Sequence, residues 1–297
     1  MKPAPRTVLI ALVLLLLAGC EDQPAEDRPA VVVSILPQAG LVERIAGDHV
    51  RVVVLVSPGE SPATYLPTDR QVSEVVGAKA YFRIGVPFEN GPWLQAIADH
   101  GTSLRTVDVR EGVKLRAFGE HEEHVHGEEC GHEEHEGGDP HIWLAPDALA
   151  VQAETVAKVL SEIDPEHADA FAENLAKLKA DLEALDGRIR TMLEPHRGKR
   201  VYVFHPAWGY FCDAYGLEQV AIEIEGKEPS ESELTEIIAR AKSDGVRAIH
   251  VQPQIKGKSV EALASALKLD VRTLDPLARD VLANLESVAE TIARGFE

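Results

Sequence analysis

The chain has 297 residues, with 30 Lys and Arg against 49 Asp and Glu, which gives a formal net charge of -19 at pH 7. This excess of negative charge repels nucleic acid and anionic lipid surfaces, so it argues against a nucleic-acid-binding protein and favours cationic ligands. The length is sufficient for one large or two medium-sized domains.

The first nineteen residues are typical of a secretory signal peptide. They lack acidic residues and run apolar from Val8 to Leu17, a core too short for a permanent membrane-spanning helix. Leu17-Ala18-Gly19-Cys20 resembles a bacterial lipobox, which implies cleavage before Cys20 and a lipid on its sulfur. The alternatives are an ordinary signal peptide or an uncleaved anchor. We expect residues 1–19 to be removed and residues 20–30 to tether an exported lipoprotein to a bacterial membrane, in the periplasm or at the cell surface.

Runs of apolar, often β-branched residues predict strands in both halves of the chain. In the first half they occupy Val31–Leu36, Val50–Val56, Ala80–Ile84 and Leu104–Val109, and in the second half Arg200–Phe204, Val246–Val251 and Val271–Leu274. Helical patterns separate most of these runs, including Gln38–Ala46, Asp69–Val76 and Glu231–Lys242. The alternation of strands and helices predicts an α/β fold with parallel sheets that helices cover on both faces.

One long helical pattern lies between the two halves. Asp164-Pro165 is a typical helix start, and apolar residues then alternate spacings of four and three up to about Pro195: Phe171, Leu175, Leu178, Leu182, Leu185, Ile189 and Met192. A helix of roughly 30 residues would be about 45 Å long. A coiled-coil dimer is the alternative use of this seam, but its position between two α/β regions favours a rigid strut within a monomer. We therefore predict an N-terminal lobe over residues 31–163, a linking helix over 164–196 and a C-terminal lobe over 199–297.

Residues 120–136 form a tract of histidine and glutamate, with five histidines, eight glutamates and one cysteine. No apolar face runs through it, so it cannot offset the entropy of folding by burying surface. Imidazole, thiolate and carboxylate are ligands for divalent metals, zinc above all. The candidate ligands are His121, His124, His126, Cys130, His132 and His135. A solvated acidic loop is the alternative reading, and Cys130 could also form a disulfide with Cys212.

Three isolated residues lie at positions suited to a ligand site. His205 and Asp275 each follow a predicted strand, where ligands of open α/β sheets bind, and His141 follows Asp139-Pro140. Taken alone, each has a structural explanation as a hydrogen-bonded histidine or a helix cap. The sequence contains no HExxH zinc-protease motif, no complete phosphate-binding loop and no Gly-x-Ser-x-Gly elbow, so we do not expect an enzyme.

These residues lie within an ordered series of motifs. The series comprises Pro58 to Thr68, Asp139-Pro140-His141-Ile142-Trp143, Phe204 to Phe211, Gln252-Pro253-Gln254 and Leu274-Asp275-Pro276-Leu277. Together with the tract, the predicted strut and the lipobox, it resembles the metal-specific solute-binding proteins of ABC transporters, the zinc and manganese binding family that includes the zinc-uptake lipoproteins.

The resemblance implies two Rossmann-like α/β lobes joined by one long rigid helix, with the metal in the cleft between them. Carried over motif by motif, it makes His141, His205 and Asp275 the metal ligands. The first motif departs from the pattern, because Ala63 stands where the family usually has histidine. The missing ligand would then be water, a residue of the tract or Glu60.

The function that the resemblance implies is capture of Zn²⁺ outside the cytoplasmic membrane and its delivery to an ABC permease. Two imidazoles favour zinc over manganese, since sites made only of oxygen suit harder ions. Three alternatives remain open: a manganese or iron receptor of the same type, a periplasmic zinc buffer or chaperone, and a zinc hydrolase with an open site of two histidines and one aspartate.

Overall fold

A computed structural model describes residues 28–99, 103–117, 138–224, 226–254 and 258–297. The expected signal peptide, Cys20 and the histidine tract of residues 120–136 lie outside the described residues. Across the described ranges, no helix combines the length and the apolar character needed to cross a membrane.

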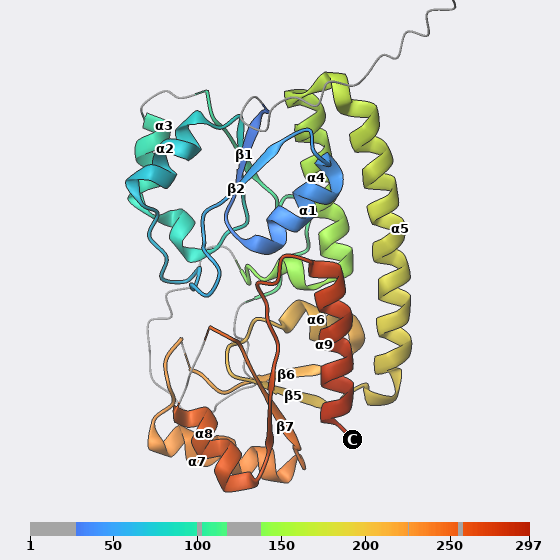
Figure 1. Ribbon diagram of the computed structural model, residues 1–297. Helices are drawn as coiled ribbons and strands as arrows, with labels where there is room; N and C mark the ends of the chain where they lie inside the picture. The colour runs from blue at the N-terminus through green and yellow to red at the C-terminus, as the bar shows by residue number, and fades with distance from the viewer. Residues whose placement is uncertain (1–27, 100–102, 118–137, 225, 255–257) are drawn as a thin grey trace, which may run out of the picture.

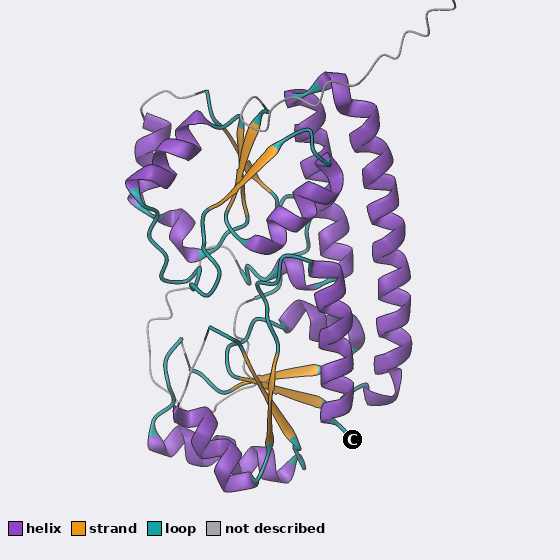
Figure 2. Ribbon diagram, viewed as in Figure 1, coloured by secondary structure: helices purple, strands orange, loops and turns teal. Residues whose placement is uncertain are grey.

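The N-terminal lobe is built on a four-stranded parallel sheet with the order β2-β1-β3-β4. The strands are β1 (Ala30–Val33), β2 (Arg51–Val54), β3 (Ala80–Arg83) and β4 (Arg105–Asp108). The helices of this lobe are α1 (Leu36–Ala46), α2 (Asp69–Gly77) and α3 (Pro92–Asp99). Helices lie on both sides of the sheet in Figure 2, which is the arrangement that parallel strands require because both of their faces are buried.

The C-terminal lobe repeats this plan with a second parallel sheet of order β6-β5-β7-β8. Its strands are β5 (Arg200–Val203), β6 (Glu218–Ala221), β7 (Ala248–Val251) and β8 (Asp270–Thr273), and its helices are α6 (Gly209–Tyr215), α7 (Glu231–Ser243), α8 (Lys258–Leu267) and α9 (Val281–Gly295). Successive residues of a strand face opposite sides of the sheet. Accordingly, Tyr202 belongs to the apolar cluster under α7 and α8, whereas Val201 and Val203 belong to the larger core. The expected α/β fold with two parallel sheets is confirmed.

Two long helices run beside the lobes (Figure 1). These are α4 (Pro146–Ile163) and α5 (Ala168–Leu193), which pack against each other. The apolar seam of α5 is buried along its length, from Phe171 to Leu193. The side-chain amide of Asn174 in α5 donates a hydrogen bond to the carbonyl oxygen of Ile45 in α1 of the N-terminal lobe, at 3.0 Å. Towards its C-terminal end, Arg188 forms an ion pair with Glu286 of α9. Because α5 is fixed to both lobes, it is built as a strut.

The lobes also contact each other directly. The backbone of α1 approaches the turn before α9 so closely at Gly40 that a Cβ atom there would lie 2.0 Å from the Arg279 carbonyl oxygen. The side chain of Arg279 forms an ion pair with Glu43 of α1, and Arg44 forms another with Asp280 at 3.1 Å. One apolar core continues from the N-terminal sheet through α4 and α5 into the C-terminal lobe. This continuity opposes wide movement of one lobe against the other.

Several details differ from the predicted elements. The first strand ends at Val33 rather than Leu36, because α1 begins there with a proline in its first turn. Asp164 does not cap the long helix: it ends α4, and a short 3-10 turn over Pro165–His167 precedes α5. Helix α4 and strand β6 were not predicted. Strand β6 is short and begins with the polar residues Glu218 and Gln219, so its apolar signal is weak.

Candidate metal centre

His141 lies in the segment that connects the N-terminal sheet to α4, just before a 3-10 turn over Ile142–Leu144. Only 9% of its surface is exposed. The carboxylate of Asp139, which is fully buried, accepts two hydrogen bonds at Oδ1, from the His141 backbone N–H at 2.9 Å and from Nδ1 of its ring at 2.7 Å. An ionised carboxylate can only accept hydrogen bonds, so the ring carries its proton on Nδ1 and directs Nε2 elsewhere.

The Asp139 carboxylate is itself held by the rest of the molecule. Arg116 donates to its Oδ2 at 3.1 Å, and the Tyr210 hydroxyl of the other lobe donates to the Asp139 carbonyl oxygen at 2.9 Å. Burial alone would raise the pKa of Asp139, but hydrogen bonds from His141 and Arg116 outweigh it, so the pKa lies below its usual value. Burial lowers the pKa of His141, and Asp139 only partly opposes this effect. At neutral pH the centre therefore holds an ionised Asp139 beside a neutral His141.

His205 comes from the C-terminal lobe, two residues beyond the end of β5. Its Nδ1 lies 2.5 Å from Oε1 of Glu223, which follows β6 in the same way. Glu223 is 7% exposed. As at His141, a carboxylate binds Nδ1, so Nε2 points away from that carboxylate. Such carboxylate–histidine pairs are typical of histidines that bind metal through Nε2.

The two lobes bring these histidines together, with Nε2 of His205 3.3 Å from Nε2 of His141 and the ring planes inclined at 72°. If both rings hold their protons on Nδ1, the two Nε2 atoms direct lone pairs at each other, which is unfavourable unless a cation or a proton lies between them. Two imidazole nitrogens bound to one tetrahedral zinc, each about 2.0–2.1 Å from the ion, would lie about 3.3 Å apart. The observed separation therefore matches that of two histidines sharing one zinc ion.

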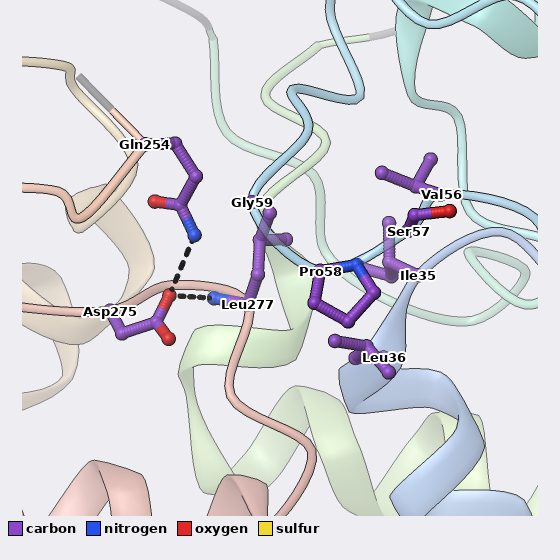
Figure 3. A pocket seen from close by; sticks show the side chains of 9 residues that line it. All are labelled: Ile35, Leu36, Val56, Ser57, Pro58, Gly59, Gln254, Asp275 and Leu277. Carbon is purple, nitrogen blue, oxygen red and sulfur yellow. Dashed lines mark hydrogen bonds between the residues drawn. The ribbon is translucent and has the colours of Figure 1, made fainter.

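Asp275 lies two residues beyond β8. Its Oδ1 accepts hydrogen bonds from Gln254 Nε2 at 3.1 Å and from the Leu277 backbone N–H at 2.9 Å. It lines a cavity of about 60 Å³ between the lobes, opposite Pro58 and Gly59 (Figure 3). Trp143 lies two residues after His141, and its indole N–H donates to the Pro276 carbonyl oxygen at 2.6 Å. This hydrogen bond connects the segment that carries His141 with the segment that carries Asp275.

Of the three residues singled out in the sequence, the structure places His141 and His205 in contact but leaves Asp275 apart from them. Within the described ranges, no three His, Cys, Asp or Glu side chains lie close enough together to hold one ion. The described residues that line the cavity with Asp275 include neither histidine. The role of Asp275 as a third ligand therefore remains a prediction.

Much of the segment with the substituted first motif is exposed. Ala63 and Glu60 are both exposed, and the Ala63 backbone N–H donates to the Ser61 hydroxyl at 3.3 Å. Pro58 and Gly59 of the same segment line the cavity across from Asp275. The first motif thus borders the cavity, although Ala63 supplies no metal-binding side chain.

Sequence reasoning missed the residues that orient the histidines. Asp139 was noted within a motif but given no role, and Glu223 and Arg116 were not singled out. Gln254, which donates to Asp275, was also noted within a motif without a role. A signal for Glu223 was present, because this acidic residue directly follows the apolar residues Val220, Ala221 and Ile222. The rule that identified His205 and Asp275, a polar side chain at the end of a buried strand, also applies to Glu223.

Comparison with known proteins shows relatives along nearly the whole chain. Residues 31–295 match the family described as the periplasmic zinc-uptake complex component A, ZnuA. The high-affinity zinc uptake system protein ZnuA of Yersinia pestis is 27% identical over 282 residues, which cover 89% of this chain and 88% of that protein. The zinc-binding lipoprotein AdcA of Streptococcus pneumoniae serotype 4 is 29% identical over 297 residues, covering 98% of this chain but only 57% of AdcA.

Solved structures agree with these matches. A crystal structure of ZnuA superposes with a TM-score of 0.82 at 37% identity, covering 91% of this chain and 100% of the other. A zinc-bound ZnuA variant that lacks residues 138–173 of its own chain superposes with a TM-score of 0.79 at 38% identity, covering 91% and 98%. The family match, the two-lobed α/β fold and the paired histidines agree, and the chain belongs to the family of the periplasmic zinc-uptake complex component A.

Proposed function

We propose that this chain is an extracytoplasmic receptor that binds Zn²⁺ between its two lobes and delivers it to the permease of an ABC importer. The observation that carries the proposal is the pair of Nε2 atoms of His141 and His205, 3.3 Å apart and each belonging to a ring held at Nδ1 by a carboxylate. This is the ligand type, tautomer and spacing that zinc requires.

In this proposal His141 and His205 supply two ligands and Asp275 a third. The Asp275 carboxylate reaches the ion by a small movement of its side chain or of the lobe that carries it. With alanine at position 63, water completes the coordination, and Glu60 and the tract of residues 120–136 are the alternative donors. A receptor has to release its cargo, so an incomplete protein ligand set is compatible with transport.

The same arrangement favours zinc uptake over the alternative functions. Paired imidazoles bind zinc better than manganese, which prefers oxygen ligands. The matched relatives bear the names of zinc-uptake and zinc-binding proteins, which favours a receptor over a buffer or a hydrolase. We further propose that lipid on Cys20 anchors the chain outside the cytoplasmic membrane, and that it has no catalytic activity.

Competition titration of the mature protein with a zinc chelator tests the function. We expect one tight zinc site, and each of His141→Ala and His205→Ala should weaken it by more than the roughly 10–100-fold that loss of an outer carboxylate costs. His196→Ala is the control, because His196 lies in the 3-10 turn that follows α5, where its contacts are with Phe296 and Lys199 and not with the paired histidines. Tight binding that survives both cleft substitutions would contradict the proposal.

A second readout comes from pH. Zinc binds the neutral imidazole, so protonation of the histidines competes with the metal. Zinc affinity should therefore fall as the pH is lowered through the range in which histidine titrates, in wild type and in His196→Ala alike.

A further inference from the structure

Glu223 contacts His205 on the ring nitrogen that does not face His141. Its Oε1 lies 2.5 Å from Nδ1 of His205, whereas Nε2 of the same ring lies 3.3 Å from His141. The carboxylate is 7% exposed, so bulk water competes little for its hydrogen bonds. Glu223 therefore controls one end of the ring while the other end faces the cleft.

The sheet itself creates this pairing. Strands β5 and β6 are parallel neighbours, and Val203 is paired with Ala221, an offset of 18 residues. His205 and Glu223 keep the same offset beyond the strand ends. Since neighbouring parallel strands end at the same edge of a sheet, the register that aligns β5 with β6 also aligns the ligand with its carboxylate.

Glu223 differs from Asp139, the carboxylate behind His141, in its surroundings. The Asp139 carboxylate forms an ion pair with the Arg116 guanidinium at 3.1 Å. Among the described residues, Glu223 forms no ion pair with Lys or Arg. Its neighbour at 2.5 Å is the His205 ring, which carries no charge when only Nδ1 is protonated. A buried carboxylate without a cationic partner is costly, and a divalent cation bound at the adjacent Nε2 would offset that cost.

We propose that Glu223 is a positioning residue for zinc binding: it holds the His205 proton on Nδ1, which presents the Nε2 lone pair to the cleft, and it adds negative charge behind the ligand. The inference rests on the proposed zinc site. Without Glu223 the ring can rotate and can carry its proton on Nε2, which removes the lone pair that binds metal. Glu223 would then set affinity without touching the ion.

The first test uses metal-free protein, so it does not depend on zinc binding. Nitrogen-15 NMR of the histidine side chains distinguishes a ring protonated at Nδ1 from one protonated at Nε2. We expect His205 to be protonated at Nδ1 in wild type and to shift towards Nε2 in Glu223→Ala, while His141 keeps its tautomer through Asp139. A His205 ring that keeps its proton on Nδ1 in Glu223→Ala would overturn the proposal.

The second test measures zinc affinity. Loss of an outer carboxylate typically costs about 10–100-fold in metal affinity, and we expect a loss in this range for Glu223→Ala. Glu223→Gln keeps an oxygen that can accept the Nδ1 proton but has no charge, so its affinity should lie between those of wild type and Glu223→Ala. Glu236→Gln is the control, because it makes the same change of charge on an exposed face of α7.

The two readouts separate failure of this inference from failure of the proposed function. If His205→Ala left zinc affinity unchanged, the cleft would not be the zinc site, yet the tautomer of His205 in metal-free protein would still report the role of Glu223. If His205→Ala abolished tight binding and Glu223→Ala did not weaken it, the zinc site would stand and the positioning role would be wrong.

Discussion

At the scale of single residues, histidines with opposite roles differ in the partners of their ring nitrogens. His141 and His205 each have one nitrogen held by a carboxylate and one directed into the cleft. His250 of β7 is 4% exposed, and its Nδ1 lies 3.1 Å from the Tyr202 carbonyl oxygen. Its Nε2 is buried and has no hydrogen-bond partner among the described residues. A carbonyl only accepts, so Nδ1 carries the proton. Within the described part of the chain His250 has no acidic partner, and it is a buried neutral histidine of the C-terminal lobe.

His250 should make the stability of the protein depend on pH. Burial lowers its pKa to about 4, whereas histidine in an unfolded chain titrates near about 6.5. As the pH falls, the unfolded chain therefore takes up this proton before the folded one does. The contribution of His250 to stability is full above about pH 6.5 and is lost down to about pH 4, by up to about 3 kcal/mol.

Urea unfolding of metal-free protein at several pH values between 7.5 and 4.5 measures this effect. His250→Leu has no titrating group at this position, so its free energy of unfolding should fall less steeply with pH than that of wild type. His196→Ala again serves as the comparison, since His196 is only partly buried. Equal pH slopes in wild type and His250→Leu would show that burial of His250 does not drive the acid sensitivity.

At the scale of elements, the described residues on either side of the histidine tract meet beside the proposed centre. The Asp139 backbone N–H donates to the Arg116 carbonyl oxygen at 2.9 Å, two residues from His141. Gly138 between them has φ of 69°, and a Cβ atom there would lie 2.8 Å from the same carbonyl oxygen. Glycine is therefore needed where the chain returns from the tract, because other residues rarely adopt this conformation and would collide.

Deletion of residues 120–136 should leave the fold intact, because five residues would still connect Arg116 to Asp139. Shortening a loop changes its closure entropy only slowly with length, so the free energy of unfolding should rise by only about 1 kcal/mol. We expect one tight zinc site to remain and weaker sites to disappear. Calorimetric titration measures both stoichiometry and affinity. Loss of the tight site would instead show that the tract supplies the ligand absent at Ala63.

At the scale of the whole molecule, the lobes are fixed together at several places around the cleft. Trp143 binds the Pro276 carbonyl oxygen, Tyr210 binds the Asp139 carbonyl oxygen, and Gly40 of α1 packs against the Arg279 backbone. The helix α5, 26 residues long and about 39 Å in length, spans both lobes behind these contacts. Rotation about a hinge would break all of them at once, so the molecule is built for small adjustments.

Zinc binding should therefore change the overall shape little. Small-angle X-ray scattering of tract-deleted protein, with and without one equivalent of zinc, should give radii of gyration that agree within experimental error. Trp143→Phe removes the hydrogen bond to Pro276 but keeps an aromatic ring in the core, and it should allow a larger change if this contact restrains the lobes. A marked contraction of the parent protein on zinc binding would indicate hinge closure instead.

Much of the fold could be predicted from local patterns in the sequence. The alternation of β-branched runs with helical segments predicted both parallel sheets, and the four-three spacing from Phe171 to Met192 predicted the long helix. Helix α4 was missed although it carries buried apolar residues along its length. Strand β6 was missed because its first two residues are polar, so its place in the sheet depends on pairing with β5 rather than on its own pattern.

The sequence by itself determined the fold class and the long helix, because strand and helix periodicities are local properties of the chain. It also placed His205 and Asp275 at the ends of predicted strands, whereas the set of three candidate ligands came from the resemblance to a known family. Only the tertiary structure decided that His141 and His205 meet at 3.3 Å, that Asp275 lies apart from them, and that Glu223 stands behind His205. These relations depend on sheet register and on the docking of two lobes, and both join residues far apart in the chain. Composition and periodicity do not carry that information.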